Sequence, residues 1–242
     1  MPEQTLQFDA DNIETPGNAV FAGTLAKLSY DTEADVERQL KLYGLEEGAA
    51  MLSSALMSCV IVRSHDTTAV AFKGTTTWRE WLNNANVWPE PTAPGRIHAG
   101  FLNTIQHSGP IVLSLIQKDI SEGKNIVLAG HSRGGALALV FAVFLVINGH
   151  RPHSVWMFGA PRAGDGGYAA QLQGIPVKHY VRRGDPVAYL PLNIKPKSAT
   201  VRKYIENSRL GYTVVSLLSH VWIRYRLRAR GKLRSRDHNQ PR

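Results

Sequence analysis

Residues 126–136 read Ile-Val-Leu-Ala-Gly-His-Ser-Arg-Gly-Gly-Ala, and this stretch decides the fold class. It begins with an apolar run typical of a buried strand and continues into a second apolar run, 136–147, typical of a buried helix. Glycines at 130 and 134 flank Ser132 between the two runs. Because side chains collide in so tight a turn, glycine is expected on either side of it. The stretch therefore predicts a sharp strand–turn–helix unit with Ser132 at the turn.

Such a unit is a nucleophile elbow, in which a strained serine projects its hydroxyl above a sheet. The start of the following helix supplies backbone N–H groups that can stabilise a developing oxyanion. The spacing G-x-S-x-G alone is a common accident, and a glycine-rich turn whose serine only caps the helix is the alternative. The apolar strand and the apolar helix on either side favour the nucleophile.

Helix and strand patterns alternate along the rest of the chain. The patterns predict helices over 20–30, 33–58 and 101–121, and strands over 59–63, 68–73, 125–129, 155–158 and 177–181. This alternation indicates an α/β protein with a mostly parallel central sheet and helices on both faces. In such sheets the chemistry gathers where loops leave the carboxyl ends of the strands.

Composition fits one globular domain over residues 1–242, since 43% of the residues are hydrophobic. The net charge of +9 arises near the end, because residues 201–242 hold 11 Lys and Arg against 2 Asp and Glu, whereas residues 1–200 hold 17 of each. A basic end segment favours contact with an anionic surface such as lipid headgroups or nucleic acid; a merely solvated end is the alternative.

Several features bear on location and cofactors. The single cysteine, Cys59, excludes an intrachain disulfide and lies in an apolar run, so it is expected to be buried. The N-terminus lacks the pattern of a signal peptide, and the longest apolar run, Ala136–Ile147, is shorter than the about 20 residues that span a bilayer. We therefore expect a cytoplasmic location, with export without a cleaved signal as an open alternative. The nine histidines are scattered, so neither a metal nor an organic cofactor is expected.

A serine nucleophile needs a base that takes its proton and an acid that orients the base. In this architecture the acid follows the serine and the histidine comes last. Asp185 directly follows the predicted strand 177–181, whereas Asp165 lies in a flexible glycine loop. Asp185 is therefore the predicted acid, and a purely structural Asp-Pro turn is its alternative.

Two histidines follow Asp185. His220 lies in an apolar, helical stretch where a packed or capping histidine is ordinary, and His238 lies four residues from the end, where chains fray. The residues alone leave this choice open.

Five segments, in order along the chain, resemble those of the class 3 lipases, the family of fungal triacylglycerol lipases and their bacterial relatives, which have the α/β-hydrolase fold. They are Ala71-Phe-Lys-Gly-Thr75, Ile97-His-Ala-Gly-Phe101, Gly130–Ala136, Phe158-Gly-Ala-Pro-Arg162 and Asp185-Pro-Val-Ala-Tyr-Leu-Pro191. The resemblance implies Ser132 as nucleophile, Asp185 as acid and His238 as base. It also implies an oxyanion hole made by Thr75 and by the backbone N–H of Arg133. Arg133 is a departure, because the family usually has leucine there; a charge is thus expected near the acyl site.

The resemblance further implies a short helical lid over about 76–97. Three of the five tryptophans, Trp78, Trp81 and Trp88, lie in this segment. Amphipathic tryptophans suit a lid that opens onto a lipid interface, and a surface helix clamped to the body is the alternative.

We therefore predict a serine hydrolase that cleaves carboxylic esters of acylglycerols or related lipids and is activated at interfaces. A phospholipase or short-chain carboxylesterase with the same catalytic residues is the alternative. A further alternative is an inactive hydrolase fold that binds membrane or nucleic acid through residues 201–242. The expected partners are a lipid ester substrate and an anionic lipid interface, without specific nucleic acid. The oligomeric state is not predicted.

Overall fold

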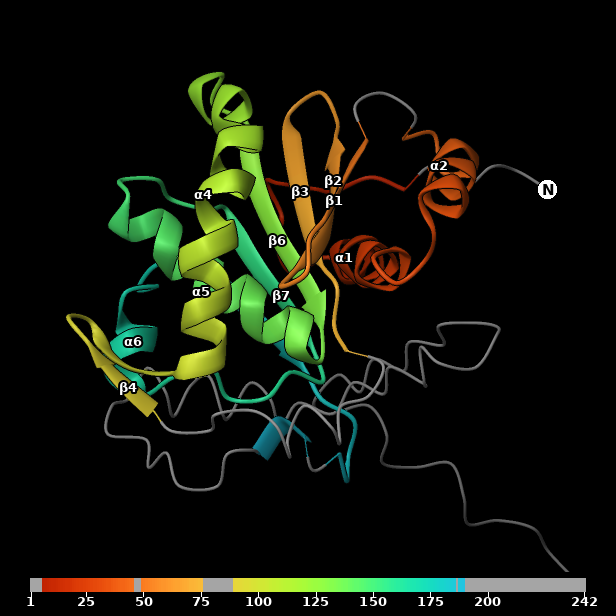
Figure 1. Ribbon diagram of the computed structural model, residues 1–242. Helices are drawn as coiled ribbons and strands as arrows, with labels where there is room; N and C mark the ends of the chain where they lie inside the picture. Colours follow the sequence, from red (N-terminus) through yellow and green to blue (C-terminus); the bar gives the residue numbers. More distant parts are fainter. Residues whose placement is uncertain (1–5, 46–48, 76–88, 186, 190–242) are drawn as a thin grey trace, which may run out of the picture.

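A six-stranded sheet forms the centre of the molecule (Figure 1). The computed structural model describes residues 6–45, 49–75, 89–185 and 187–189, and the structural statements below refer to these ranges. In spatial order, the strands are β1 (Ala50–Ser53), β2 (Ser58–Arg63), β3 (Thr67–Phe72), β6 (Asn125–His131), β7 (Ser154–Phe158) and β8 (Val177–Tyr180). Strands β3, β6, β7 and β8 are parallel, whereas β1 and β2 form an antiparallel extension. The prediction of a mostly parallel α/β sheet is confirmed.

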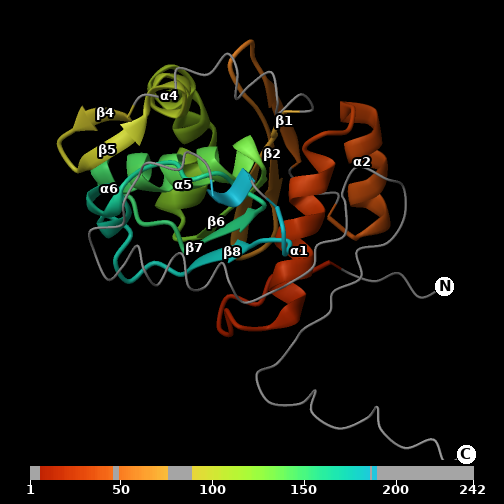
Figure 2. The same ribbon diagram turned by 90° about the horizontal axis from the view of Figure 1, so that it is seen from below.

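Helices cover both faces of this sheet (Figure 2). One face is covered by α1 (Pro16–Leu28) and α2 (Glu33–Leu42), and the other by α4 (Ala99–Ser121) and α5 (Arg133–Ile147). Strand β6 serves both cores, because its side chains alternate: Leu128 belongs to the cluster under α4 and α5, and Val127 to the cluster under α1. Helix α5 is buried along nearly its whole length, which explains its unbroken apolar run.

The remaining elements lie close to the carboxyl ends of the parallel strands. They are the ribbon of β4 (Pro89–Thr92) and β5 (Gly95–His98), the helix α6 (Gly166–Ala170) and the 3₁₀ turn η1 (Val187–Tyr189). A bridge between Ile97 and Gly164 joins the ribbon to the loop before α6, and the two lie side by side in Figures 1 and 2.

The predicted helix over 33–58 is wrong over 43–45 and 49–58, and residues 46–48 lie outside the described ranges. Helix α2 ends at Leu42, and β1 and the first residue of β2 occupy the end of the predicted range. The segment is rich in Ala, Leu and Met, which favour helix, but pairing with β2 and a turn closed by the Ser54 N–H to Met57 O bond (2.9 Å) outweigh that propensity. The other predicted helices and strands are confirmed, apart from shifts of a few residues at their ends.

Other predictions fall only partly within the described ranges. Residues 89–97 of the predicted lid form most of the β4–β5 ribbon, whereas residues 76–88, with the three tryptophans, lie outside the described residues. The basic segment 201–242 also lies outside them. None of the described helices is both long and apolar enough to cross a bilayer.

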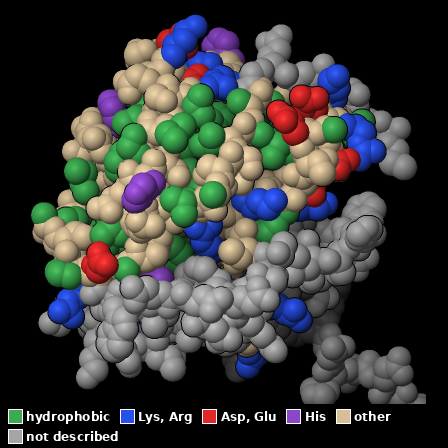
Figure 3. Space-filling view, in the orientation of Figure 1, with side chains coloured by type: hydrophobic (Ala, Val, Ile, Leu, Met, Phe, Trp, Pro, Cys, Tyr) green, Lys and Arg blue, Asp and Glu red, His purple; other side chains and the backbone are tan. Residues whose placement is uncertain are grey.

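Figure 3 shows the face covered by α4 and α5. Hydrophobic side chains are interspersed there with the other types. On α4, Ile111 and Leu115 are 47% and 41% exposed and lie one helical turn apart. Scattered apolar side chains of this kind are ordinary on a protein surface and do not identify an interface.

Burial protects the single cysteine. Cys59 is fully buried on β2, and burial raises the pKa of its thiol to about 12. We therefore expect the native protein not to react with Ellman's reagent at pH 8, because the reaction needs an accessible thiolate. The same protein in guanidinium chloride should release one equivalent of thionitrobenzoate, measured by absorbance. Rapid reaction of the native protein would show that β2 is not covered as described.

Candidate active site

Ser132 is held in a strained conformation between β6 and α5. Its backbone has φ 54° and ψ −126°, and it is the single non-glycine residue with positive φ in the described ranges. The Ser132 N–H donates to the Phe158 carbonyl of β7 (2.8 Å), and the Ser132 carbonyl accepts from the Gly135 N–H in the first turn of α5 (3.0 Å). The predicted elbow is therefore present in its geometry, and strain of this kind is concentrated at functional sites.

Two glycines make the elbow possible. A Cβ on Gly130 would lie 2.3 Å from the Gly134 carbonyl oxygen, and a Cβ on Gly134 would lie 2.1 Å from the Phe72 carbonyl oxygen. These neighbours are backbone atoms, which cannot swing aside as a side chain can. The first turn of α5 is thus packed directly against the ends of β6 and β3.

Thr75 lies just beyond the end of β3, in the loop that Gly134 touches through Phe72 and Lys73. The hydroxyl oxygen of Thr75 is buried and has no hydrogen-bond partner in the described part of the chain. Arg133 begins α5, where backbone N–H groups have no partner within the helix. Both predicted oxyanion donors therefore belong to the same edge of the sheet as Ser132. Their role in an oxyanion hole stays a prediction.

Asp185 belongs to this edge as well, in the loop after β8. Its Oδ1 accepts from the Val187 N–H (3.0 Å), and its Oδ2 lies 3.2 Å from where a Cβ on Gly159 would be. Gly159 has φ 55° and ends β7, so glycine there both adopts the left-handed conformation and leaves room for the carboxylate. Asp165, the weaker candidate, instead caps α6 by accepting from the Tyr168 N–H (3.1 Å).

The structure adds a residue that the sequence patterns did not single out. Tyr30, just past the end of α1, has its hydroxyl 2.9 Å from His131 Nδ1 and accepts from the Gly74 amide. A Cβ on Gly74 would lie 2.0 Å from the Tyr30 oxygen, so only glycine admits this contact. Tyr30 thereby joins the loop before Thr75 to the last residue of β6. A glycine directly before Thr75 was the available signal, but it did not identify the partner.

His131 lies between Tyr30 and the side of Asp185. Burial raises the pKa of Tyr30 to about 12, so the hydroxyl keeps its proton and forms a hydrogen bond with Nδ1. The other ring nitrogen, Nε2, is 3.8 Å from the position of the same hypothetical Gly159 Cβ that approaches Asp185. Burial lowers the pKa of His131, and the charge of Asp185 offsets part of that effect. His131 is thus a neutral imidazole on the side of Asp185.

The predicted base lies outside the described residues. Neither His220 nor His238 falls within them, and in the described part of the chain the Ser132 hydroxyl makes no hydrogen bond. His98 and His179 have structural roles, because His98 Nδ1 accepts from the Gly100 N–H and His179 Nε2 accepts from the Ala160 N–H. His238 as the base therefore stays a prediction that rests on the resemblance, with His220 as the alternative.

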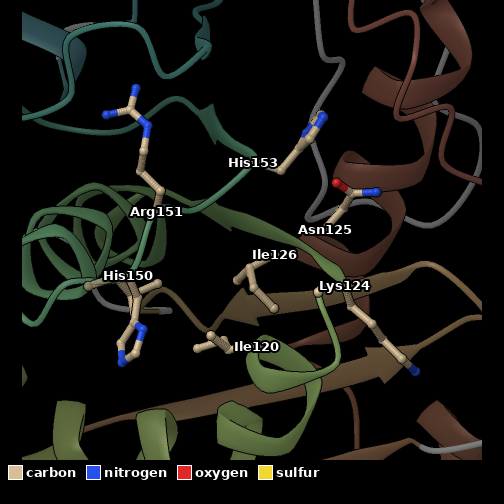
Figure 4. A pocket seen from close by; sticks show the side chains of 9 residues that line it. Ile120, Lys124, Asn125, Ile126, His150, Arg151 and His153 are labelled. Carbon is tan, nitrogen blue, oxygen red and sulfur yellow. The ribbon is translucent and has the colours of Figure 1, made fainter.

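A cavity of about 360 Å³ lies at the opposite edge of the sheet, beside the start of β6 (Figure 4). Lys124, His150, Arg151 and His153 line it together with apolar residues. Figure 4 shows these side chains pointing away from one another. Arg151 donates to the Gln173 carbonyl (3.0 Å). The polar groups therefore do not converge on one ligand position, and the cavity is not part of the site around Ser132.

Comparisons with known proteins agree with this geometry. A family model described as "Lipase (class 3)" matches residues 69–195, just over half of the chain. Phospholipase A1-II 7 of Oryza sativa is 26% identical over 181 residues, which cover 55% of this chain and 44% of the relative. Secreted mono- and diacylglycerol lipase 1 of Fusarium solani is 30% identical over 129 residues, 50% of this chain and 38% of the relative. The chain thus spans less than half the length of these curated relatives.

Solved structures show the same fold. Lipase II from Rhizopus niveus matches with a TM-score of 0.63 at 22% identity, covering 72% of this chain and 73% of that chain. The lipase from Rhizopus microsporus var. chinensis matches with a TM-score of 0.62 at 22% identity, covering 79% and 78%. The α/β-hydrolase fold predicted from the sequence is confirmed.

The close packing of the elbow predicts that Gly134→Ala destabilises the protein. The added methyl group would meet the backbone of β3, so the change should lower the free energy of unfolding by about 1–3 kcal/mol or prevent folding. Gly17→Ala in α1 is the control, because nothing lies within 4 Å of its Cβ position and alanine favours helix. Urea denaturation measures both variants. Equal stability of the two would show that the elbow is more loosely packed than described.

The Tyr30–His131 contact predicts a loss of activity in Tyr30→Phe. The change removes the hydroxyl that joins the loop at Gly74 to His131, the last residue of β6. The loop that leads to Thr75 is then held less firmly beside Ser132. We therefore expect kcat/KM to fall about two- to tenfold at pH 8, the effect of a missing hydrogen bond.

Initial rates with a soluble nitrophenyl ester test this, and Tyr43→Phe, at the end of α2, is the matched control. A kcat/KM of folded Tyr30→Phe equal to that of the unaltered protein would contradict the role of the contact.

Proposed function

Because the chain belongs to the class 3 lipase family, we propose that it hydrolyses carboxylic ester bonds of acylglycerols or related lipids through an acyl-enzyme. The observation that supports this most directly is the strained Ser132 at the carboxyl edge of a parallel sheet, with Asp185 held at the same edge by the loop after β8. The relatives at 26% and 30% identity are a phospholipase A1 and a mono- and diacylglycerol lipase, so both kinds of lipid ester are candidate substrates.

In the proposed reaction, His238 removes the proton of the Ser132 hydroxyl as its oxygen attacks the ester carbonyl. Asp185 orients the imidazole and stabilises its positive charge. The Thr75 hydroxyl and the Arg133 N–H donate to the oxyanion of the tetrahedral intermediate. His238 then protonates the departing alcohol, and water, activated by the same imidazole, releases the fatty acid and regenerates Ser132.

Neutral His131 fits this proposal. A positive charge on His131 would disfavour the imidazolium that must form on His238 during attack. Burial lowers the pKa of His131, so it stays uncharged at neutral pH. The carboxylate of Asp185 is thereby left to the catalytic imidazole as its charged partner.

Access to a lipid surface is the second part of the proposal. The tryptophans at 78, 81 and 88 suit a lid that exposes apolar surface at an interface, and the basic segment 201–242 suits attraction to anionic headgroups. The exposed Leu56, in the turn between β1 and β2 at the carboxyl edge, is a further apolar side chain on the side where lipid would approach. A rate that rises steeply when the substrate forms micelles would support interfacial activation.

Substitution of the proposed catalytic residues tests the mechanism. Ser132→Ala and His238→Ala should lower kcat by about 10³-fold or more, whereas His220→Ala should keep most activity. Asp185→Asn should lose a similar factor, because the imidazole would then be held in the wrong tautomer. Asp165→Asn is its matched control and should stay near the activity of the unaltered protein.

Titration of released fatty acid from tributyrin measures these rates, and thermal unfolding checks that each variant is folded. A folded His238→Ala variant with full activity, beside an inactive His220→Ala, would transfer the base to His220. Full activity in folded Ser132→Ala would end the proposal.

A further inference from the structure

Arg133 follows the nucleophile in the chain, and its side chain carries a positive charge. Its guanidinium extends from the first turn of α5 to two other elements: Nη2 donates to the Leu56 carbonyl (2.8 Å) and to the Thr104 hydroxyl (3.1 Å). Leu56 lies in the turn before β2, whose second residue, Cys59, pairs with Phe72 at the end of β3, and Thr104 lies in the second turn of α4. The guanidinium is therefore held at the carboxyl edge, between the β1–β2 turn and α4.

Both partners of this guanidinium are neutral, and one nitrogen makes both bonds. The N–H groups on Nε and Nη1 have no partner in the described ranges, and no carboxylate there lies within ion-pair distance. Three other partly buried cations have an acidic partner, whereas Lys73 and Arg162, like Arg133, have no ion pair in the described residues. Arg63 pairs with Asp119 (2.9 Å), Lys124 approaches the same carboxylate (3.7 Å), and Lys178 pairs with Glu14.

This arrangement favours an anionic partner. Burial lowers the pKa of Arg133, which means that its surroundings disfavour the charge, yet a guanidinium stays protonated at any physiological pH. A partly desolvated charge with only neutral partners gains from an anionic partner. The two bonds use both hydrogens of Nη2, so the N–H groups of Nε and Nη1, which point to different sides of the planar guanidinium, remain to donate charge-assisted hydrogen bonds to a phosphate or carboxylate.

The substrate itself can supply that anion. In a glycerophospholipid, the phosphate lies within one glycerol unit of each ester carbonyl, a span similar to the length of an arginine side chain. A substrate whose ester carbonyl is at Ser132 therefore brings its phosphate within reach of residue 133. Neutral acylglycerols have no charged group to offer.

We propose that Arg133 is a specificity-determining residue that binds the phosphodiester of a glycerophospholipid through its free N–H groups, so that the site favours phospholipid esters over neutral acylglycerols. This inference rests on the proposed ester hydrolysis at Ser132. It assigns the substrate class to the Arg133 side chain, whereas the Arg133 backbone N–H belongs to the proposed oxyanion hole.

The test compares three short-chain substrates below their micellar concentrations: dihexanoyl phosphatidylcholine, dihexanoyl phosphatidylglycerol and dihexanoylglycerol. Monomeric substrates remove the contribution of a lipid surface. The measured quantity is kcat/KM for each phospholipid divided by kcat/KM for the diacylglycerol. In Arg133→Leu this ratio should fall about 10- to 100-fold for both phospholipids, the effect of a lost charge-assisted hydrogen bond.

Two further variants sharpen the result. Arg133→Gln keeps an N–H donor for Leu56 and Thr104 but removes the charge, so it should show the same fall even if the leucine variant folds poorly. Arg133→Lys should retain part of the preference, because lysine keeps the charge without the planar fork. Arg183→Leu is the matched control: Arg183 is an exposed arginine two residues from Asp185, and its ratio should change less than twofold.

An unchanged ratio in folded Arg133→Leu and Arg133→Gln would overturn the inference. A fall for phosphatidylglycerol alone would also overturn it, because that pattern reflects net charge and not a bond to phosphate. An equal fall in Arg183→Leu would do the same. If the unaltered protein cleaves none of the three substrates faster than Ser132→Ala, the proposed function fails instead.

Discussion

The rest of the site depends on one constraint, the left-handed backbone of Ser132. A conformation of this kind costs about 1–3 kcal/mol and persists only where its surroundings hold it. Here the N–H of Ser132 is bound to Phe158 on β7 and its carbonyl caps the first turn of α5. The order β3-β6-β7 in the sheet meets the same requirement. Strand β7 lies on one side of β6 and binds the Ser132 N–H. Strand β3 lies on the other side, where the start of α5 packs against it. The elbow is thus a property of the whole sheet edge.

Two glycines and Tyr30 make close contacts possible at this edge of the sheet. Gly159 leaves space where Asp185 and His131 approach each other, and Gly74 leaves space for the Tyr30 hydroxyl. The loop after β3 is thereby joined to the last residue of β6 through Tyr30, and Asp185, after β8, lies on the side of Gly159. Because Tyr30 directly follows the end of α1, on the opposite face of the sheet from α5, the site contacts elements of both cores of the protein. A partly buried, neutral Tyr30–His131 pair also keeps a second positive charge away from the proposed catalytic imidazole.

The sequence predicted the features that local chemistry dictates and missed those set by distant contacts. The strands from Cys59 to Phe72, the elbow and helix α5 follow from apolar periodicity and glycine spacing, and each is present. Strand β1 was missed because its Ala, Leu and Met residues favour helix, and only pairing with β2 overrides them. Tyr30 was missed because its partner is 101 positions away, and no local pattern encodes that distance. Asp185 could be predicted because a strand end is a local signal. Its hydrogen bond to Val187 could not be predicted from the sequence.

The backbone N–H and the side chain of Arg133 have separate roles in the proposed site. Its N–H is fixed by α5 and is the same for any side chain, so the proposed oxyanion donor does not depend on which residue stands there. Its side chain leaves the helix toward the β1–β2 turn and α4, where it contacts neutral oxygens. Catalytic geometry and substrate preference can therefore change independently at this position. A leucine, as the family usually has, makes that rim apolar, whereas Arg133 puts there a charge with no counter-ion in the described residues. If Arg133 binds phosphate as proposed, exchange at this one residue turns a neutral-lipid site toward phosphate without any change in the elbow that holds Ser132.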